Sequence, residues 1–220
     1  MGLPLLRPAL IVVLALAANF ANAAELAALV KDALGKPLAD AVVLATPLDP
    51  KAAQHAPAPG DAVDQVDKQF VPYVKPIYVG SMVRFPNNDH IRHQVYSFSP
   101  AKNFELPLYA GSQAAPVQFD KPGVVVLGCN IHDWMIGYIY VADTPFFAKT
   151  GANGMAHLAD LPPGEYSVRI WHPGLEGGEA ATKQMITIVA DQPAQAQWRL
   201  NVKLPVRVPR VSGAGSSVYP

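Results

Sequence analysis

The sequence predicts an all-β protein built from small antiparallel sandwiches. Proline accounts for 22 of the 220 residues, about twice its usual share of roughly 5%, and it falls between short runs rich in Val, Ile and Tyr. Short β-prone runs separated by frequent turn residues are typical of sandwiches. No stretch after the N-terminal segment has the length and the 3.6-residue period of a helix.

The composition limits the number of domains that the chain can form and the classes of partner that it can bind. Half of the residues are hydrophobic and 15% are charged, which is enough apolar material for one or two packed domains. The formal net charge at pH 7 is zero, which argues against nucleic acid or an anionic membrane surface as the main partner.

Residues 1–23 have the features of a signal peptide. Arg7 supplies a positive charge, residues 9–18 (ALIVVLALAA) form an apolar core, and residues 21–23 (ANA) fit the small-x-small cleavage pattern. The apolar core is shorter than the roughly 20 residues that span a bilayer. We therefore expect a periplasmic protein that is not integral to the membrane after cleavage, with an uncleaved N-terminal anchor as the alternative.

Three segments of the mature chain differ in pattern. Residues 25–48 alternate around the turn-rich stretch DALGKP and predict two strands, whereas residues 49–60 (DPKAAQHAPAPG) read as a linker. Residues 61–145 predict one sandwich, with turn signals such as PNND and DKPG between the strands. Its expected strands are 69–71, 77–85, 94–99, 117–119, 124–127 and 137–141.

A second set of strands follows. Residues 148–203 contain the alternating stretches MAHLADL, EYSVRIW, KQMITIV and AQWRLNV. Residues 204–220 hold three prolines without periodicity, and we expect a flexible tail.

Cys129 is the single cysteine of the chain. In an oxidising compartment an unpaired cysteine is a buried inert residue, a reactive thiol or a metal ligand. Here it begins the pattern C-x2-H-x2-M with His132 and Met135. Two His and one Cys near a plane with a weak axial Met are the ligands of a blue-copper centre. The second histidine must come from another strand, and His93 is favoured over His90 because it directly precedes the strand 94–99.

Residues 63–141 resemble a small cupredoxin of the plastocyanin and amicyanin type. The matching pieces are IYVGSMVRFPNND (77–89), HQV (93–95), DKPGVVVLGC (120–129) and CNIHDWM (129–135). The resemblance implies a Greek-key sandwich that holds one type 1 copper through His93, Cys129, His132 and Met135. The whole chain also resembles bacterial exported proteins usually labelled methylamine utilization proteins.

Three residues depart from the cupredoxin pattern. Gly128 stands where an aromatic residue often precedes the cysteine, Ile131 where a proline often precedes the second histidine, and Gln94 where Asn or Ser is common. The ligands themselves are intact. Because of these three changes, the sequence does not predict which hydrogen bonds surround the ligands. Such hydrogen bonds help to set the reduction potential.

The ligand set implies electron transfer rather than catalysis. It suits both copper oxidation states, and no nucleophile or acid–base pair accompanies it. The expected partners are redox proteins, a cytochrome or a dehydrogenase, which dock on Ile131, Trp134 and Ile136 around His132. Trp134 is equally well explained as a ring that shields the metal. The alternatives are a copper carrier or sensor and a metal-free β-sandwich binding module.

The outer segments resemble a second type of domain. Residues 29–43 and 150–170 are similar to carboxypeptidase-regulatory-like modules, which implies a small transthyretin- or Ig-like sandwich. Neither segment has enough strands for a core of its own. We therefore expect one sandwich from residues 25–48 and 148–203, split by the cupredoxin domain. The alternative is an N-terminal hairpin that extends the cupredoxin sheet. His55, His157 and His172 lie in the linker and in this second set, and we expect them to be non-ligands.

Overall fold

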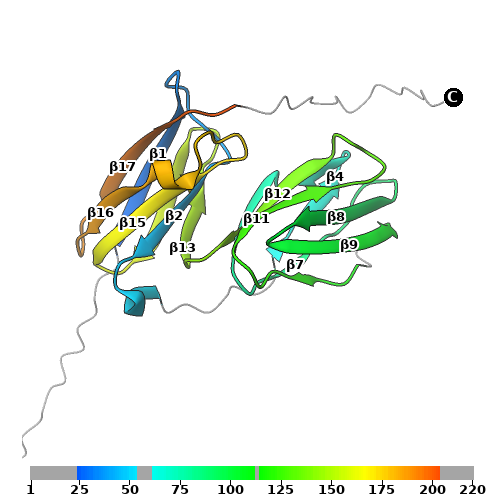
Figure 1. Ribbon diagram of the computed structural model, residues 1–220, viewed down its shortest axis with the longest axis horizontal. Helices are drawn as coiled ribbons and strands as arrows, with labels where there is room; N and C mark the ends of the chain where they lie inside the picture. Colours follow the sequence, from blue (N-terminus) through cyan, green and yellow to red (C-terminus); the bar gives the residue numbers. More distant parts are fainter. Residues whose placement is uncertain (1–23, 54–60, 112–113, 204–220) are drawn as a thin grey trace, which may run out of the picture.

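The computed structural model describes residues 24–53, 61–111 and 114–203. The described chain forms two all-β bodies side by side (Figure 1), and its helical segments are two 3-10 turns, Pro50–Ala53 and Glu179–Thr182. The all-β prediction is confirmed. None of the helices in the described ranges combines the length and apolar character needed to cross a bilayer. The predicted signal peptide and tail lie outside the described residues.

One body is a sandwich of strands from both ends of the described chain. Its two sheets have the orders β14-β1-β17 and β13-β2-β15-β16. The bounds are β1 Ala24–Asp32, β2 Val42–Pro47, β13 Phe146–Lys149, β14 Met155–Leu161, β15 Gly164–Trp171, β16 Gln184–Ile188 and β17 Ala194–Leu200. Alternate residues of β1 point into the core, among them Leu26, Ala28 and Val30. Neither β1 nor β2 pairs with a strand of the other body.

The other body contains the strands between residues 61 and 142. A five-stranded sheet, β6-β12-β11-β8-β9, packs with a three-stranded sheet, β10-β7-β3, and the hairpin β4-β5 lies beside them. The bounds are β3 Asp61–Ala62, β4 Asp64–Val66, β5 Gln69–Val71, β6 Val74–Tyr78, β7 Met82–Arg84, β8 His93–Ser99, β9 Lys102–Tyr109, β10 Val117–Gln118, β11 Gly123–Gly128 and β12 Ile136–Ala142.

The prediction of one strand over 77–85 is wrong. The segment is divided between β6 and β7, which belong to different sheets. The chain turns at Gly80, whose φ of 90° favours glycine, and the Gly80 N–H donates to the Phe119 carbonyl at 2.7 Å. Period-2 alternation did not reveal this break because the apolar pattern continues across it. Strand β9 was also hidden, since Pro107 interrupts its pattern.

A third apolar cluster joins the two bodies. Val42 and Leu44 from β2 and Trp171 from β15 pack against Val74 of β6 and the end of β12. The Trp171 ring lies 5.8 Å from that of Tyr138 and 5.2 Å from that of Tyr140 between centroids. The outer face of the five-stranded sheet is therefore partly covered by the other sandwich.

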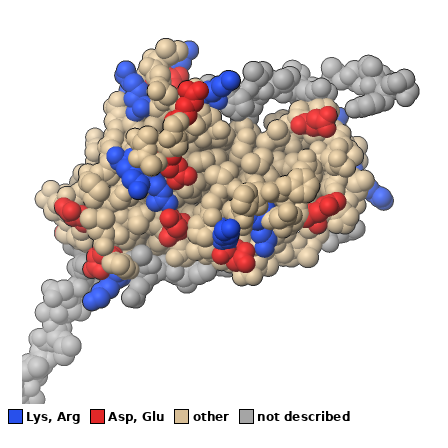
Figure 2. Space-filling model, viewed as in Figure 1, with Lys and Arg blue, Asp and Glu red and all other residues tan. Residues whose placement is uncertain are grey.

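Polar contacts border this apolar interface. The Arg169 guanidinium donates to Glu179 at 3.1 Å and to the Thr46 hydroxyl at 2.9 Å, and it pairs with Asp143. The Tyr140 hydroxyl donates to Glu179 at 2.7 Å. Burial is the main cause that raises the pKa of Tyr140, and the Glu179 carboxylate is the second. The hydroxyl therefore remains a donor. Elsewhere on the face shown in Figure 2, charges of both signs are interspersed.

Leu44→Ala should destabilise the protein, because it leaves a cavity at the interface between the two bodies. Leu44 is fully buried, and we expect a loss of about 2–5 kcal/mol in the free energy of unfolding. The measurement is equilibrium unfolding in urea. Leu34→Ala is the matched control, since Leu34 is 82% exposed and should change stability by less than about 0.5 kcal/mol. Equal effects of the two variants would contradict this interface.

Candidate metal centre

The segment between β11 and β12 is a tight loop that begins at Cys129. The His132 N–H donates to the Cys129 carbonyl at 3.3 Å, and the Met135 N–H donates to the His132 carbonyl at 2.9 Å. Two successive four-residue turns that share His132 thus place Cys129, His132 and Met135 on one compact loop. These turns explain the C-x2-H-x2-M spacing of the three residues in the sequence.

At position 128, where β11 ends and this loop begins, the structure requires a residue without a side chain. Gly128 is opposite Tyr96 in the pairing of β11 with β8, and a Cβ at Gly128 would lie 2.6 Å from Cζ of the Tyr96 ring. The absence of a side chain lets the ring lie against the backbone next to Cys129. The Tyr96 ring of the neighbouring strand thus packs against the residue that precedes Cys129.

His93 is the first residue of β8 and is fully buried. Asn87 orders the loop that leads to it. Its side-chain amide donates to the carbonyls of Ile91 at 2.9 Å and Tyr109 at 2.8 Å, and its Oδ1 accepts the Asp89 N–H at 3.0 Å. A buried amide with these partners fixes the loop in one conformation. The position of His93 is therefore imposed by the fold.

A second buried side chain supports the same loop. Gln65 of β4 donates to the Tyr109 hydroxyl at 2.6 Å and to the Pro86 carbonyl at 3.2 Å. The Tyr109 hydroxyl donates in turn to the Phe85 carbonyl. Burial raises the pKa of Tyr109 to about 12, so the hydroxyl stays protonated and the chain of donors is intact at neutral pH.

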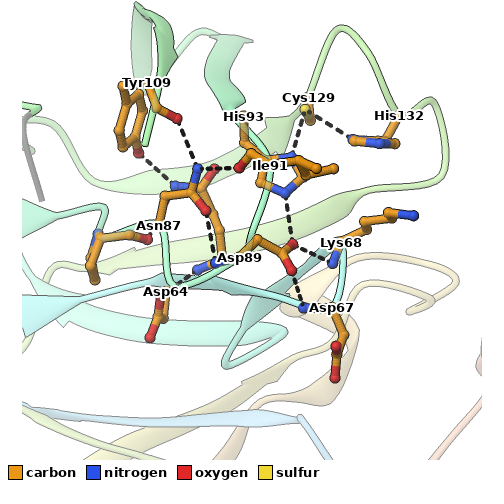
Figure 3. Close-up of polar contacts among 12 residues, drawn as sticks. Asp64, Asp67, Lys68, Asn87, Asp89, Ile91, His93, Tyr109, Cys129 and His132 are labelled. Carbon is orange, nitrogen blue, oxygen red and sulfur yellow. Dashed lines mark hydrogen bonds and ion pairs between the residues drawn. The ribbon is translucent and has the colours of Figure 1, made fainter. Parts of the chain in front are cut away.

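Three ligand-type atoms converge at the end of the sandwich. The Cys129 Sγ is 3.7 Å from Nδ1 of His93 and 3.8 Å from Nδ1 of His132 (Figure 3). The two imidazole centroids are 4.9 Å apart. Cys129 and His93 are buried, whereas His132 is partly exposed. Among the described residues, this is the group of three His, Cys or acidic side chains whose ligand atoms lie within 4.8 Å of one another.

The separations fit a shared metal ion better than a thiol hydrogen bond. A thiol has one proton to donate, whereas two imidazole nitrogens approach this sulfur. Ligand atoms bound at about 2.0–2.3 Å from one ion lie about 3.5 Å apart (S to N) in a tetrahedral site and about 3.8 Å apart in a trigonal one. The observed 3.7 and 3.8 Å are therefore suited to atoms that share one ion.

Met135 is 1% exposed and belongs to the same apolar core cluster as Cys129. Both residues line an open cavity of about 290 Å³ at the outer face of β8 and β11. Cys129 and Met135 are nevertheless almost fully buried, at 2% and 1% exposure. A thioether in this place suits a weak axial ligand.

The other histidines lie apart from the cluster. His90 is exposed on the loop before β8, and His157 is exposed and paired with Glu25. His172 is buried in the other body, where its Nδ1 accepts the Gly174 N–H at 3.0 Å. Burial lowers the pKa of His172. His55 lies outside the described residues.

Three apolar residues close to His132 in the sequence are partly exposed. Ile131 is 45% exposed, Trp134 37% and Ile136 43%. The Trp134 ring meets that of His132 edge-on, with centroids 5.1 Å apart. Trp134 therefore both covers one side of the imidazole and contributes to the surface.

Asp89 is a further residue of the site that the sequence pattern did not reveal. Its Oδ2 is 2.7 Å from Nε2 of His93. Burial alone would raise the pKa of Asp89, but hydrogen bonds from the Lys68 N–H and from His93 hold it below the usual value. The available signal was an acid four residues before the histidine in NNDHIRH.

The comparisons with solved structures concern less than half of the chain. No protein-family model and no curated protein matches it. Among solved structures, the Cu-containing nitrite reductase from Thermus scotoductus is 31% identical over 44% of this chain and 27% of its own, with a TM-score of 0.37. The purple cupredoxin from Nitrosopumilus maritimus is 21% identical over 39% of this chain and 100% of its own, with a TM-score of 0.34. A reduced amicyanin variant is 20% identical over 44% of this chain and 98% of its own, with a TM-score of 0.35.

These matches cover less than half of the chain, with TM-scores below 0.5. The chain spans about a quarter of the length of the nitrite reductase. The described residues form an all-β structure, part of the chain is similar in fold to cupredoxins, and the chain carries a His–Cys–His cluster suited to a metal.

Gly128→Ala should destabilise the protein by about 1–3 kcal/mol, because the new methyl group overlaps the Tyr96 ring. The same substitution in a Tyr96→Ala background should cost distinctly less. Urea unfolding of the four proteins measures this coupling. Additive effects of the two substitutions would show that the ring does not lie against Gly128.

Proposed function

We propose that the chain is an exported type 1 copper protein that carries single electrons between redox proteins. His93, Cys129 and His132 are the strong ligands, and Met135 is the weak axial one. The observation that carries this proposal is the approach of two imidazole Nδ1 atoms to one buried thiol at 3.7 and 3.8 Å. A copper ion held there supplies a reversible one-electron change.

The protein's contribution is to hold its ligands in place. His93 comes from a loop ordered by buried hydrogen bonds, and the other ligands come from a loop of two tight turns. Ligands that are already gathered need little movement when an electron arrives or leaves, and slow reorganisation is avoided. The three strong ligands and Met135 would fill the coordination positions, which favours electron transfer over catalysis.

His132 is the ligand through which we propose that electrons pass to a partner. It is the partly exposed member of the cluster. Trp134 lies against its ring, and we propose that the exposed Ile131, Trp134 and Ile136 form the docking surface. A small apolar surface suits brief encounters with a cytochrome or a dehydrogenase. We further propose that the protein acts in the periplasm and that the split outer sandwich is a scaffold for the copper domain.

Loading the purified protein with Cu(II) should produce an intense visible thiolate-to-copper absorption. Cys129→Ser should abolish this band because the thiolate is its source, and Met135→Gln should shift it. His93→Ala should remove the type 1 spectrum, whereas His90→Ala should retain it, since His90 is exposed on the same loop.

The same preparation separates the alternatives. Reversible voltammetry with retained metal supports an electron carrier, whereas rapid loss of copper to a chelator would favour a carrier or sensor of the metal itself. A protein that stays colourless with Cu(II) would contradict the proposal and leave a metal-free binding module.

A further inference from the structure

We propose that Asp89 is a positioning residue for the metal site. Its carboxylate fixes the tautomer and the orientation of His93 before any metal binds. This inference rests on the proposed function, because it assigns the carboxylate a role toward the ion that His93 would hold.

The contact at His93 determines which nitrogen carries the proton. Nε2 lies 2.7 Å from Oδ2 of Asp89, and an ionised carboxylate only accepts hydrogen bonds. The proton of neutral His93 is therefore on Nε2, and Nδ1 keeps its lone pair. Nδ1 is the atom that faces the Cys129 sulfur at 3.7 Å (Figure 3). The other tautomer, with its proton on Nδ1, would direct that proton at the ion.

Asp89 is itself held by the backbone of another element. Asp67 and Lys68 form the two-residue turn of the β4-β5 hairpin, with φ angles of 51° and 58°. The N–H of Asp67 donates to Oδ1 of Asp89 at 3.1 Å, and that of Lys68 donates to Oδ2 at 2.7 Å. Successive turn N–H groups form an anion-binding concavity. The hairpin turn therefore holds the Asp89 carboxylate in position independently of His93.

The carboxylate has two consequences for a bound ion. A hydrogen bond from a ligating imidazole to a carboxylate raises the basicity of the ligand and restrains the ring, and the loss of such a partner typically lowers metal affinity by about 10- to 100-fold. The negative charge also favours the more positive oxidation state. Asp89 should therefore lower the reduction potential.

A simpler interpretation gives Asp89 a purely structural role, in which it ties the loop before β8 to the hairpin turn. Both interpretations predict that a substitution lowers stability. They differ at the imidazole, because the structural role makes no demand on the His93 tautomer, the copper affinity or the reduction potential.

The test is Asp89→Asn in the purified full chain, with two readouts. The first is ¹⁵N NMR of the histidine rings in the copper-free protein, in mildly alkaline buffer where imidazoles are neutral. We expect the Nε2–H tautomer of His93 in the unmodified protein and a mixture of tautomers in the variant. An Nδ1–H tautomer in the unmodified protein would overturn the proposal, even if the variant fails to fold.

The second readout is copper titration and voltammetry. We expect the Cu(II) affinity of Asp89→Asn to fall by about 10- to 100-fold and its reduction potential to rise. Asp133→Asn is the matched control: it removes the same charge from an exposed residue of the ligand loop, and it should leave the tautomer unchanged and move the affinity and potential less. Equal changes of affinity and potential in the two variants would show that Asp89 acts through its charge alone, and would overturn the positioning role.

The outcomes distinguish this inference from the proposed function. If the protein binds no copper, the type 1 function fails, while the tautomer measurement still decides the role of Asp89. If the protein shows the type 1 spectrum but Asp89→Asn keeps its tautomer, affinity and potential, the function stands and the inference fails.

Discussion

The pairing of Gly128 with Tyr96 is the constraint on which the site depends. It joins the end of β11 to β8, and so brings the residue after Gly128 close to the residue that begins β8. Cys129 and His93 are 36 positions apart in the chain, yet their ligand atoms become neighbours. The lack of a side chain at Gly128 allows this approach, because the Tyr96 ring takes the space that a Cβ would fill.

The site combines an apolar interior with a small number of buried, hydrogen-bonded polar side chains. Phe119, Leu127 and Met135 are among the largest fully buried side chains of this body, and Met135 belongs to the same apolar cluster as Cys129. Burying Asn87 and Gln65 is unfavourable unless their amides find partners. The Asn87 amide donates to the Ile91 and Tyr109 carbonyls, and the Gln65 amide donates to the Pro86 carbonyl and the Tyr109 hydroxyl. The same bonds that satisfy these amides hold the histidine in place, so folding stability and ligand geometry have a common origin.

The sequence revealed the candidate ligands more readily than the fold around them. Cys129, His132 and Met135 are close in the chain, and their spacing directly reflects two local turns. The division of residues 77–85 at Gly80 was hidden, because alternation of apolar residues carries no information about which sheet a strand joins. Asp89 was hidden for a related reason: its partners at residues 67 and 68 belong to a different hairpin. Contacts between elements distant in sequence are set by tertiary packing and leave no local pattern.

The proposed function requires one ion shared by Nδ1 of His93, Sγ of Cys129 and Nδ1 of His132. A crystal structure of the copper-loaded protein, with anomalous data collected at the copper absorption edge, would locate that ion. We expect one strong anomalous peak between these three atoms and near the sulfur of Met135. A peak at another place, such as the exposed His157 and Glu25 pair, with none at Cys129, would show that these atoms do not share a copper ion.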